Sequence, residues 1–125
     1  MSKEESEIAG APRDICERTF WFAARIIRLV QAVPRTQAGN VVARQLIRSG
    51  TSVGANVEEA QGGHTKKEFA RRMNIARPEA RETLYWLRLI QETELVAKSR
   101  MKDIIGEADE LVRILTTIVK RTRRE

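Results

Sequence analysis

Apolar residues recur along most of the chain in steps of three, four and seven, the spacing that gathers side chains on one face of an α-helix. This pattern predicts helices over 14–33 and 36–61, a third after Thr65 and a fourth from near Ser99. The predicted inward positions are Ile15, Phe22, Ile26, Leu29, Val33, Val42, Leu46, Ser49, Val53, Val57, Ala60, Phe69, Met73, Ala76, Ala80, Thr83, Leu87, Ile90, Ile104, Ala108, Leu111, Leu115, Ile118 and Val119. No stretch alternates with the two-residue period of a half-buried strand. We therefore predict an all-α, antiparallel up-down-up-down four-helix bundle.

Capping and breaking residues stand where these segments begin and end. Asp14 is a candidate cap of the first helix, and Pro34 should end it. Gly62–Gly63 should stop the second helix. Thr65 followed by Glu68 has the pattern of a capping box at the start of the third.

The length of 125 residues predicts a single domain over 1–125, with 1–12 and 121–125 frayed or disordered. Pro78 should bend the third helix without ending it. No run of about eighteen apolar residues exists, and the acidic first residues do not resemble a signal peptide, so we expect neither a membrane span nor export. Cys16 is the only cysteine, which fits a reducing cytoplasm.

A row of polar side chains accompanies the apolar face of the second helix. Ser52, Asn56 and Glu59 follow one another in steps of four and three, so they share a face beside the apolar positions. A buried amide or carboxylate needs hydrogen-bond partners, and Arg48 with Arg81 or Glu82 could supply them. This row is a structural polar network, a ligand or catalytic site, or a subunit contact. The candidate members of the network are Arg48, Ser52, Asn56, Glu59 and Glu82.

Basic residues form two further stripes. The net charge is +6 with a pI near 10.1, and 17 of the 23 basic residues are arginine, the side chain that forks onto phosphate. Each stripe also carries an aromatic residue, Trp21 on the first helix and Tyr85 on the third, a combination found where nucleic acid is gripped. The alternative is an ordinary solvated helix face. The candidate nucleic-acid contacts are Arg18, Arg25, Arg28, Lys67, Arg71, Arg81 and Arg88.

Three aromatic residues lie off the predicted apolar faces: Phe20, Trp21 and Trp86. Aromatic side chains in such positions are typical of subunit interfaces. They favour a homo-oligomer over a monomer.

Catalytic and metal-binding patterns are missing from the sequence. Carboxylate di-iron bundles need Glu-x-x-His pairs from two helices, and His64 is the only histidine. Cys16 has no base motif around it and is better explained as a small packing residue. The segment "QGGHTKK" lacks the spacing of a phosphate loop. We therefore expect no catalytic residue, metal or cofactor.

The segment "RQLIRSGTSVGANVEEAQGGHTKKEFARRMNIARPEARETLYWLRLIQETELV" resembles the bacterial four-helix-bundle proteins first recognised as open reading frames in intervening sequences of 23S rRNA genes. The likeness rests on the Ser-x-x-x-Asn-x-x-Glu pattern of Ser52, Asn56 and Glu59, on "KKEF" and on "EARETLYWL". Weaker similarity in "FAARIIRLV" and "EADELVRIL" extends it to most of the chain. One departure is Glu59-Ala60 where relatives often have Glu-Gly, so the second helix should run slightly longer.

This resemblance implies a bundle that assembles as a ring-shaped homopentamer. It also implies distant kinship to the accessory proteins of diversity-generating retroelements, basic pentamers that bind nucleic acid and a reverse transcriptase. With the arginine stripes, it favours a non-enzymatic cytoplasmic bundle that binds RNA or DNA, as an accessory to a nucleoprotein complex. The alternative is a protein-interaction scaffold with no direct role in nucleic-acid binding.

Overall fold

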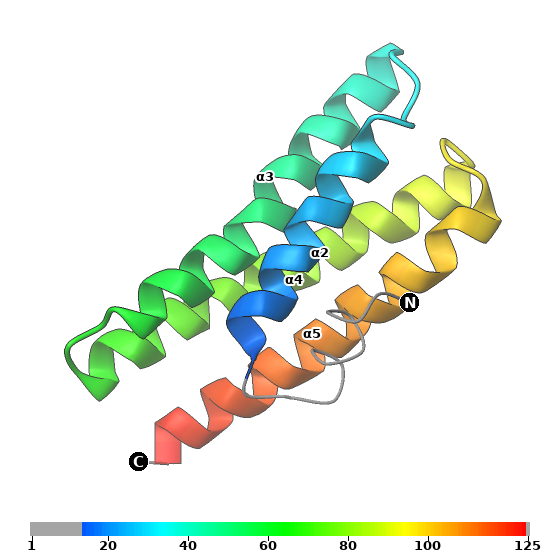
Figure 1. The fold of residues 1–125 in the computed structure, drawn as a ribbon. Helices are drawn as coiled ribbons and strands as arrows, with labels where there is room; N and C mark the ends of the chain where they lie inside the picture. The colour runs from blue at the N-terminus through cyan, green and yellow to red at the C-terminus, as the bar shows by residue number, and fades with distance from the viewer. Residues whose placement is uncertain (1–13, 125) are drawn as a thin grey trace.

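The computed structural model describes residues 14–124, which form four α-helices and no strand (Figure 1). The helices are α2 (Ile15–Val30), α3 (Gln37–Gln61), α4 (Lys66–Thr93) and α5 (Lys98–Arg124). The predicted all-α four-helix architecture is confirmed for this part of the chain.

Successive helices run in opposite directions. The α2–α3 and α4–α5 connections lie at one end of the bundle, and the α3–α4 connection lies at the other end with the C-terminus (Figure 1). α3 packs along α2 and α4, and α4 packs along α5, whereas α2 and α5 approach each other much less closely. The line along which α2 and α5 face each other is called the α2–α5 seam below.

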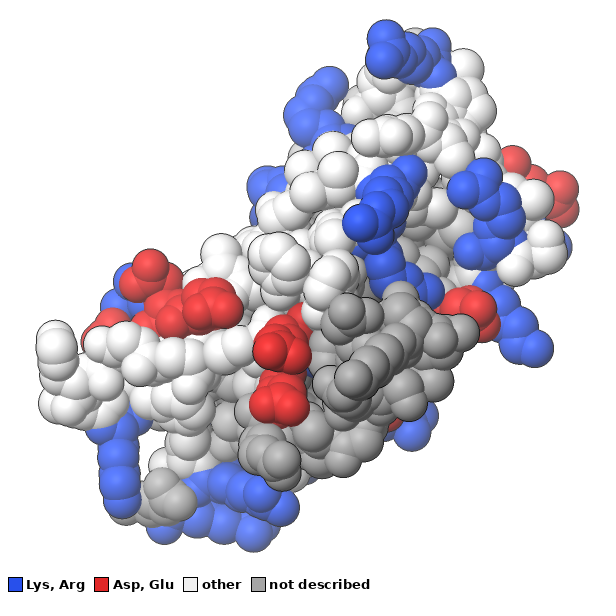
Figure 2. All heavy atoms as spheres, in the orientation of Figure 1, with Lys and Arg blue, Asp and Glu red and all other residues white. Residues whose placement is uncertain are grey.

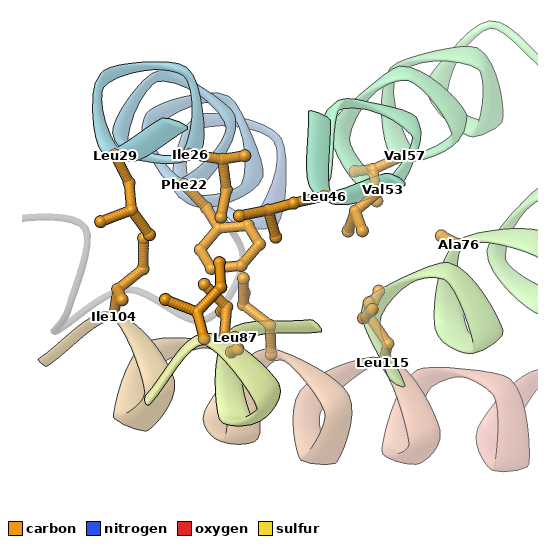
Figure 3. Close-up of a cluster of buried hydrophobic side chains, with 14 of the residues drawn as sticks. Phe22, Ile26, Leu29, Leu46, Val53, Val57, Ala76, Leu87, Ile104 and Leu115 are labelled. Carbon is orange, nitrogen blue, oxygen red and sulfur yellow. The ribbon is translucent and has the colours of Figure 1, made fainter. Parts of the chain in front are cut away.

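The core consists of the predicted inward residues together with Val96 and Met101. All of them are buried except Phe69 and Ile118, which are half-buried against the core. Phe22, Ile26 and Leu87 meet Leu46 near the middle of the bundle (Figure 3). Burying one such side chain contributes roughly 1.5–3 kcal/mol.

Two glycines of α3 allow α2 to pack very closely. A Cβ atom at Gly50 would lie 3.0 Å from side-chain carbons of Ile26. A Cβ at Gly54 would lie 3.2 Å from the carbonyl oxygen of Thr19. A larger residue at either position would push the two helices apart, because a packed interior leaves little free space.

The helix ends follow the sequence signals with two corrections. The side chains of Thr36 and Thr65 each accept a backbone N–H at 3.0 Å, and α3 stops at Gln61 just before the glycines. Asp14 occupies the cap position of α2, but its side chain makes no capping hydrogen bond. α2 also ends at Val30, three residues earlier than predicted. The backbone N–H groups of residues 31–33 donate to carbonyl oxygens three residues earlier, so the chain forms tight turns before Pro34.

Two predictions about helix continuity have different outcomes. α4 continues through Pro78 as predicted, and the bend at that residue stays a prediction. α5 is helical to Arg124, so the structure extends the helix into the tail that we expect to fray. The prediction for 1–12 lies outside the described residues.

Candidate nucleic-acid interface

Arg18 does not belong to the surface on which the sequence placed it. Its side chain is only 6% exposed, because the guanidinium turns across the α2–α5 seam. Nε and Nη2 donate to the Glu107 carboxylate at 3.0 and 2.8 Å, and Nη2 lies 3.1 Å from Glu110. The hydrogen bond to Glu107 raises the pKa of the Arg18 guanidinium above its ordinary value. A guanidinium that is buried and held by two carboxylates is poorly placed to reach a phosphate, so the structure separates Arg18 from the exposed basic residues.

The other two arginines of α2 lie about two and three turns further along the helix. Arg25 is half-buried and Arg28 is exposed, and both line a hollow of about 220 Å³ together with Leu29 of α2 and Arg100 and Ile104 of α5. We call this feature the arginine hollow. Basic side chains predominate over the end of α2 and the start of α5 (Figure 2). Within residues 14–124, no ion pair involves any of these three arginines.

The stripe on α4 is exposed but uneven in charge. Arg71 is neutralised by Glu68, which accepts from it at 2.6 and 3.2 Å. This contact lowers the pKa of the Glu68 carboxyl and raises that of Arg71. Lys67, Arg81 and Arg88 are exposed. Arg81 and Arg88 have no carboxylate partner in the part of the chain that the structure describes.

An exposed aromatic residue lies between those two arginines on the helix face. Tyr85 is 57% exposed, and its ring meets Trp86 edge to face with ring centroids 5.0 Å apart. Arg81, Tyr85 and Arg88 follow one another in steps of four and three, so they share one outward face. This face combines two free guanidinium groups with a ring on which a base could stack.

The polar row of α3 divides into two groups. Arg48 donates to Glu82, and to Glu79 at 3.3 Å, across to α4. Trp86 Nε1 donates to the same Glu82 carboxylate at 2.9 Å. Sequence reasoning found Arg48 and Glu82 but not Glu79, although Glu79 lies within one turn of Glu82 on the same helix.

The second group contains Ser52 and Asn56. The Asn56 amide donates to the carbonyl and hydroxyl oxygens of Ser52 at 2.9 and 3.1 Å, and Arg72 donates to Asn56 at 3.4 Å. Glu59 is exposed near the end of α3, and its side chain forms no hydrogen bond within residues 14–124. Within residues 14–124 the predicted members therefore form two separate groups, and the Glu59 side chain joins neither.

A buried polar contact lies between these two groups. The hydroxyl oxygens of Ser49 and Thr83 are 3.0 Å apart in the core, and Thr83 also donates to the carbonyl of Glu79 at 2.7 Å. The periodicity placed both residues inward but did not pair them, because their positions differ by 34 along the chain. They join α3 to α4 at the level of the Arg48 group.

The off-face aromatics of α2 are accessible in the single chain. Phe20 is 61% exposed and meets Trp21 edge to face with centroids 5.6 Å apart. Ile27 on α2 and Ile47 on α3 are also exposed. Isolated exposed apolar residues are normal, but two aromatic pairs on one small bundle are suited to contacts with another chain.

Cys16 and His64 are the two other reactive side chains among residues 14–124 that the sequence analysis considered. Cys16 is half-buried, and burial raises the pKa of its thiol, which disfavours the reactive thiolate. His64 is exposed in the α3–α4 connection. Among residues 14–124, no three His, Cys, Asp or Glu side chains come together to hold a metal ion. No helix of the described segment has the length and apolar character needed to span a membrane.

The fold and surface define a small basic helical bundle with arginines at its faces. The profile of the 23S rRNA-intervening sequence proteins matches residues 13–117, and the chain belongs to this family. It is also similar to a solved structure from Bacteroides thetaiotaomicron, described as a protein with unknown function from the S23 ribosomal protein family. That similarity has a TM-score of 0.78 and 34% identity, covering 87% of this chain and 97% of the other. No curated protein matches the chain.

Proposed function

We propose that this protein is a non-enzymatic, self-assembling helical bundle that binds nucleic acid through arginines that form no ion pair within residues 14–124. The observation that carries the proposal is the contrast within the basic residues. Arg18 and Arg71 are held by carboxylates, whereas Arg25, Arg81 and Arg88 have no carboxylate partner within residues 14–124. A free guanidinium can fork onto a phosphate without first breaking an internal ion pair.

The net charge and family membership support the same function. A charge of +6 on 125 residues attracts polyanions, although by itself it identifies no partner. The family is named for sequences that interrupt 23S rRNA genes, which makes RNA a reasonable first ligand to test. Contacts made mostly to phosphates would give weak sequence preference and strong salt dependence.

Self-assembly is the second part of the proposal. The exposed rings of Phe20 and Tyr85 and the ring-shaped pentamer implied by the family resemblance support it. A closed ring would repeat each basic surface around one axis and strengthen its field. Light scattering at micromolar concentration should give a mass that is a multiple of 14.3 kDa, and a particle of 14.3 kDa would contradict assembly.

A protein-docking scaffold is the alternative, favoured by the exposed Phe20, Ile27 and Ile47. The experiment that separates the two functions measures binding of single-stranded RNA and duplex DNA by fluorescence anisotropy at increasing salt. Nucleic-acid binding should weaken steeply with salt. No binding to either probe, or binding that salt does not change, would contradict the proposed function and favour the scaffold.

A matched pair of double variants tests the role of the unpaired arginines. Arg81→Gln/Arg88→Gln removes two free guanidinium groups. Arg71→Gln/Arg113→Gln removes the same charge from groups already paired with Glu68 and Asp109. The first variant should reduce the slope of log K against log salt by about two units, and the second by clearly less. Equal reductions of the slope in the two variants would contradict the proposal that the unpaired arginines bind nucleic acid.

A further inference from the structure

We infer that the arginine hollow is a binding site for a terminal phosphate monoester of a nucleic-acid strand. This inference deepens the proposed function and rests on it for the identity of the ligand. The hollow lies between the end of α2 and the start of α5, so its charges come from two helices that are distant in the sequence.

The helix register brings the three arginines together. Arg18 meets Glu107 across the α2–α5 seam, and α2 and α5 run in opposite directions (Figure 1). Two turns forward on α2 is Arg25, and two turns back on α5 is Arg100. On α5, a cation therefore stands at the helical position two turns from Glu107, and Arg25 and Arg100 line the same hollow.

The walls of the hollow fit a phosphate with one substituent. Arg25, Arg28 and Arg100 each carry five N–H donors, whereas Leu29 and Ile104 supply apolar surface. Leu29 and Ile104 point toward each other at the edge of the core (Figure 3). The guanidinium groups stay accessible to an anion, because Arg28 and Arg100 are exposed.

Charge and position favour a terminal phosphate over an internal one. An internal phosphodiester has one negative charge and continues the chain on both sides, which keeps it outside a concave site. A terminal monoester has three unbridged oxygens, and because its second pKa is roughly 6, it carries nearly two charges at neutral pH. Arg100 also lies in the first turn of α5, where the helix dipole favours an anion.

The empty hollow is electrostatically unfavourable. Three like charges face one concavity, and no carboxylate within residues 14–124 forms an ion pair with any of them. A bound phosphate removes this repulsion, so it should stabilise the fold beyond the general effect of salt. This stabilisation is a readout that does not depend on nucleic-acid binding.

The test compares short single-stranded RNAs of one sequence with a 5′-phosphate, a 3′-phosphate or hydroxyls at both ends. Either the 5′-phosphorylated or the 3′-phosphorylated strand should bind about tenfold more tightly than the strand with two hydroxyl ends. A hydrogen bond to a charged group contributes at least the free energy that corresponds to a tenfold change in affinity. Arg100→Gln should lose the preference. Lys102→Gln, which removes an exposed cation from the same region of α5 outside the hollow, should keep it.

Each outcome separates the site from the proposed function. Equal binding of all three strands by the natural protein overturns the terminal-phosphate site and leaves nucleic-acid binding standing. An unchanged preference in Arg100→Gln also overturns it. If no strand binds, the proposed function fails, and the midpoint of thermal unfolding in inorganic phosphate then shows whether the hollow binds phosphate. A midpoint higher than in sodium chloride of equal ionic strength, with the increase lost in Arg100→Gln, supports a phosphate site for a free ligand, and the absence of this increase overturns the site altogether.

Discussion

The two halves of the α2–α5 seam differ in how they treat an arginine of α2. In one half Arg18 is buried and held by Glu107 and Glu110. Two turns away, Arg25 faces a hollow shared with Arg28 and Arg100. α2 and α5 lie further apart at this end of the bundle (Figure 1), and on α5 Arg100 takes the helical position that Glu107 has in the first half.

The comparison shows how a fold sorts equivalent charges into structural and functional ones. A guanidinium that is buried needs a carboxylate, because an unpaired charge in the interior is very costly. A guanidinium at the edge of the bundle keeps water as an alternative partner and can stay free. The number of arginines alone therefore overestimates how many can bind a ligand. Those that form ion pairs with carboxylates on other helices have to be subtracted.

The largest expected effect comes from breaking the paired half. Glu107→Leu leaves the buried Arg18 guanidinium with only the exposed Glu110, so the free energy of unfolding should fall by about 3 kcal/mol. Urea unfolding followed by circular dichroism at fixed protein concentration measures the change. Arg18→Met/Glu107→Leu removes both charges and should recover most of the loss. A Glu107→Leu protein as stable as the natural one would show that the pair is not structural.

A smaller effect is expected from copying the paired arrangement into the other half. Arg100→Glu places a carboxylate near Arg25, as Glu107 lies near Arg18. Nucleic-acid affinity should fall about tenfold or more, because the hollow loses a donor and gains a repulsive charge. Stability should change by less than about 1 kcal/mol, since Arg28 and Arg100 are exposed. Lys102→Glu carries the same charge change outside the hollow. An equal loss of affinity in both variants would contradict a specific role of the hollow in binding.

The smallest effect concerns an exposed pair, Glu68 with Arg71. Hydrogen bonding from Arg71 lowers the pKa of Glu68 in the folded protein, so folding is favoured above the ordinary pKa of 4.5. The contribution should disappear as pH falls below 4.5 through the folded pKa. Unfolding measured between neutral and acidic pH should therefore show a slightly larger acid loss for the natural protein than for Glu68→Gln. A greater acid loss in the variant would contradict this pairing.

Helical periodicity was sufficient to predict the bundle and nearly all of its core. It also contained a signal for Arg18 that a search for basic stripes overlooked. Arg18 lies three residues after Ile15 and four before Phe22, so its spacing places it on the inward face. The sequence could not reveal that Glu107 would neutralise it, because these residues are 89 positions apart and meet only through the register of two helices.

The same limit explains the other differences. Arg100 was not among the predicted contacts, since its distance from Arg25 depends on the relative translation of α5 and α2 along the bundle. Glu59 was assigned to the polar network by its spacing from Asn56, but the chain leaves α3 just after it. Periodicity determines which face of a helix a residue occupies. Contacts between helices also depend on their relative translation, which a single sequence does not show.

The most direct test of the central claim is the salt dependence of RNA binding by a protein lacking four unpaired arginines. Arg25, Arg28, Arg81 and Arg88 are all replaced by glutamine, and light scattering and thermal unfolding verify that the variant is folded and assembled. Each replacement should change stability by no more than about 0.5 kcal/mol. The slope of log K against log salt should fall by up to about four units, with a large loss of affinity at low salt. A folded, assembled variant that binds RNA as tightly as the natural protein, with the same slope, would contradict the claim that unpaired arginines bind nucleic acid.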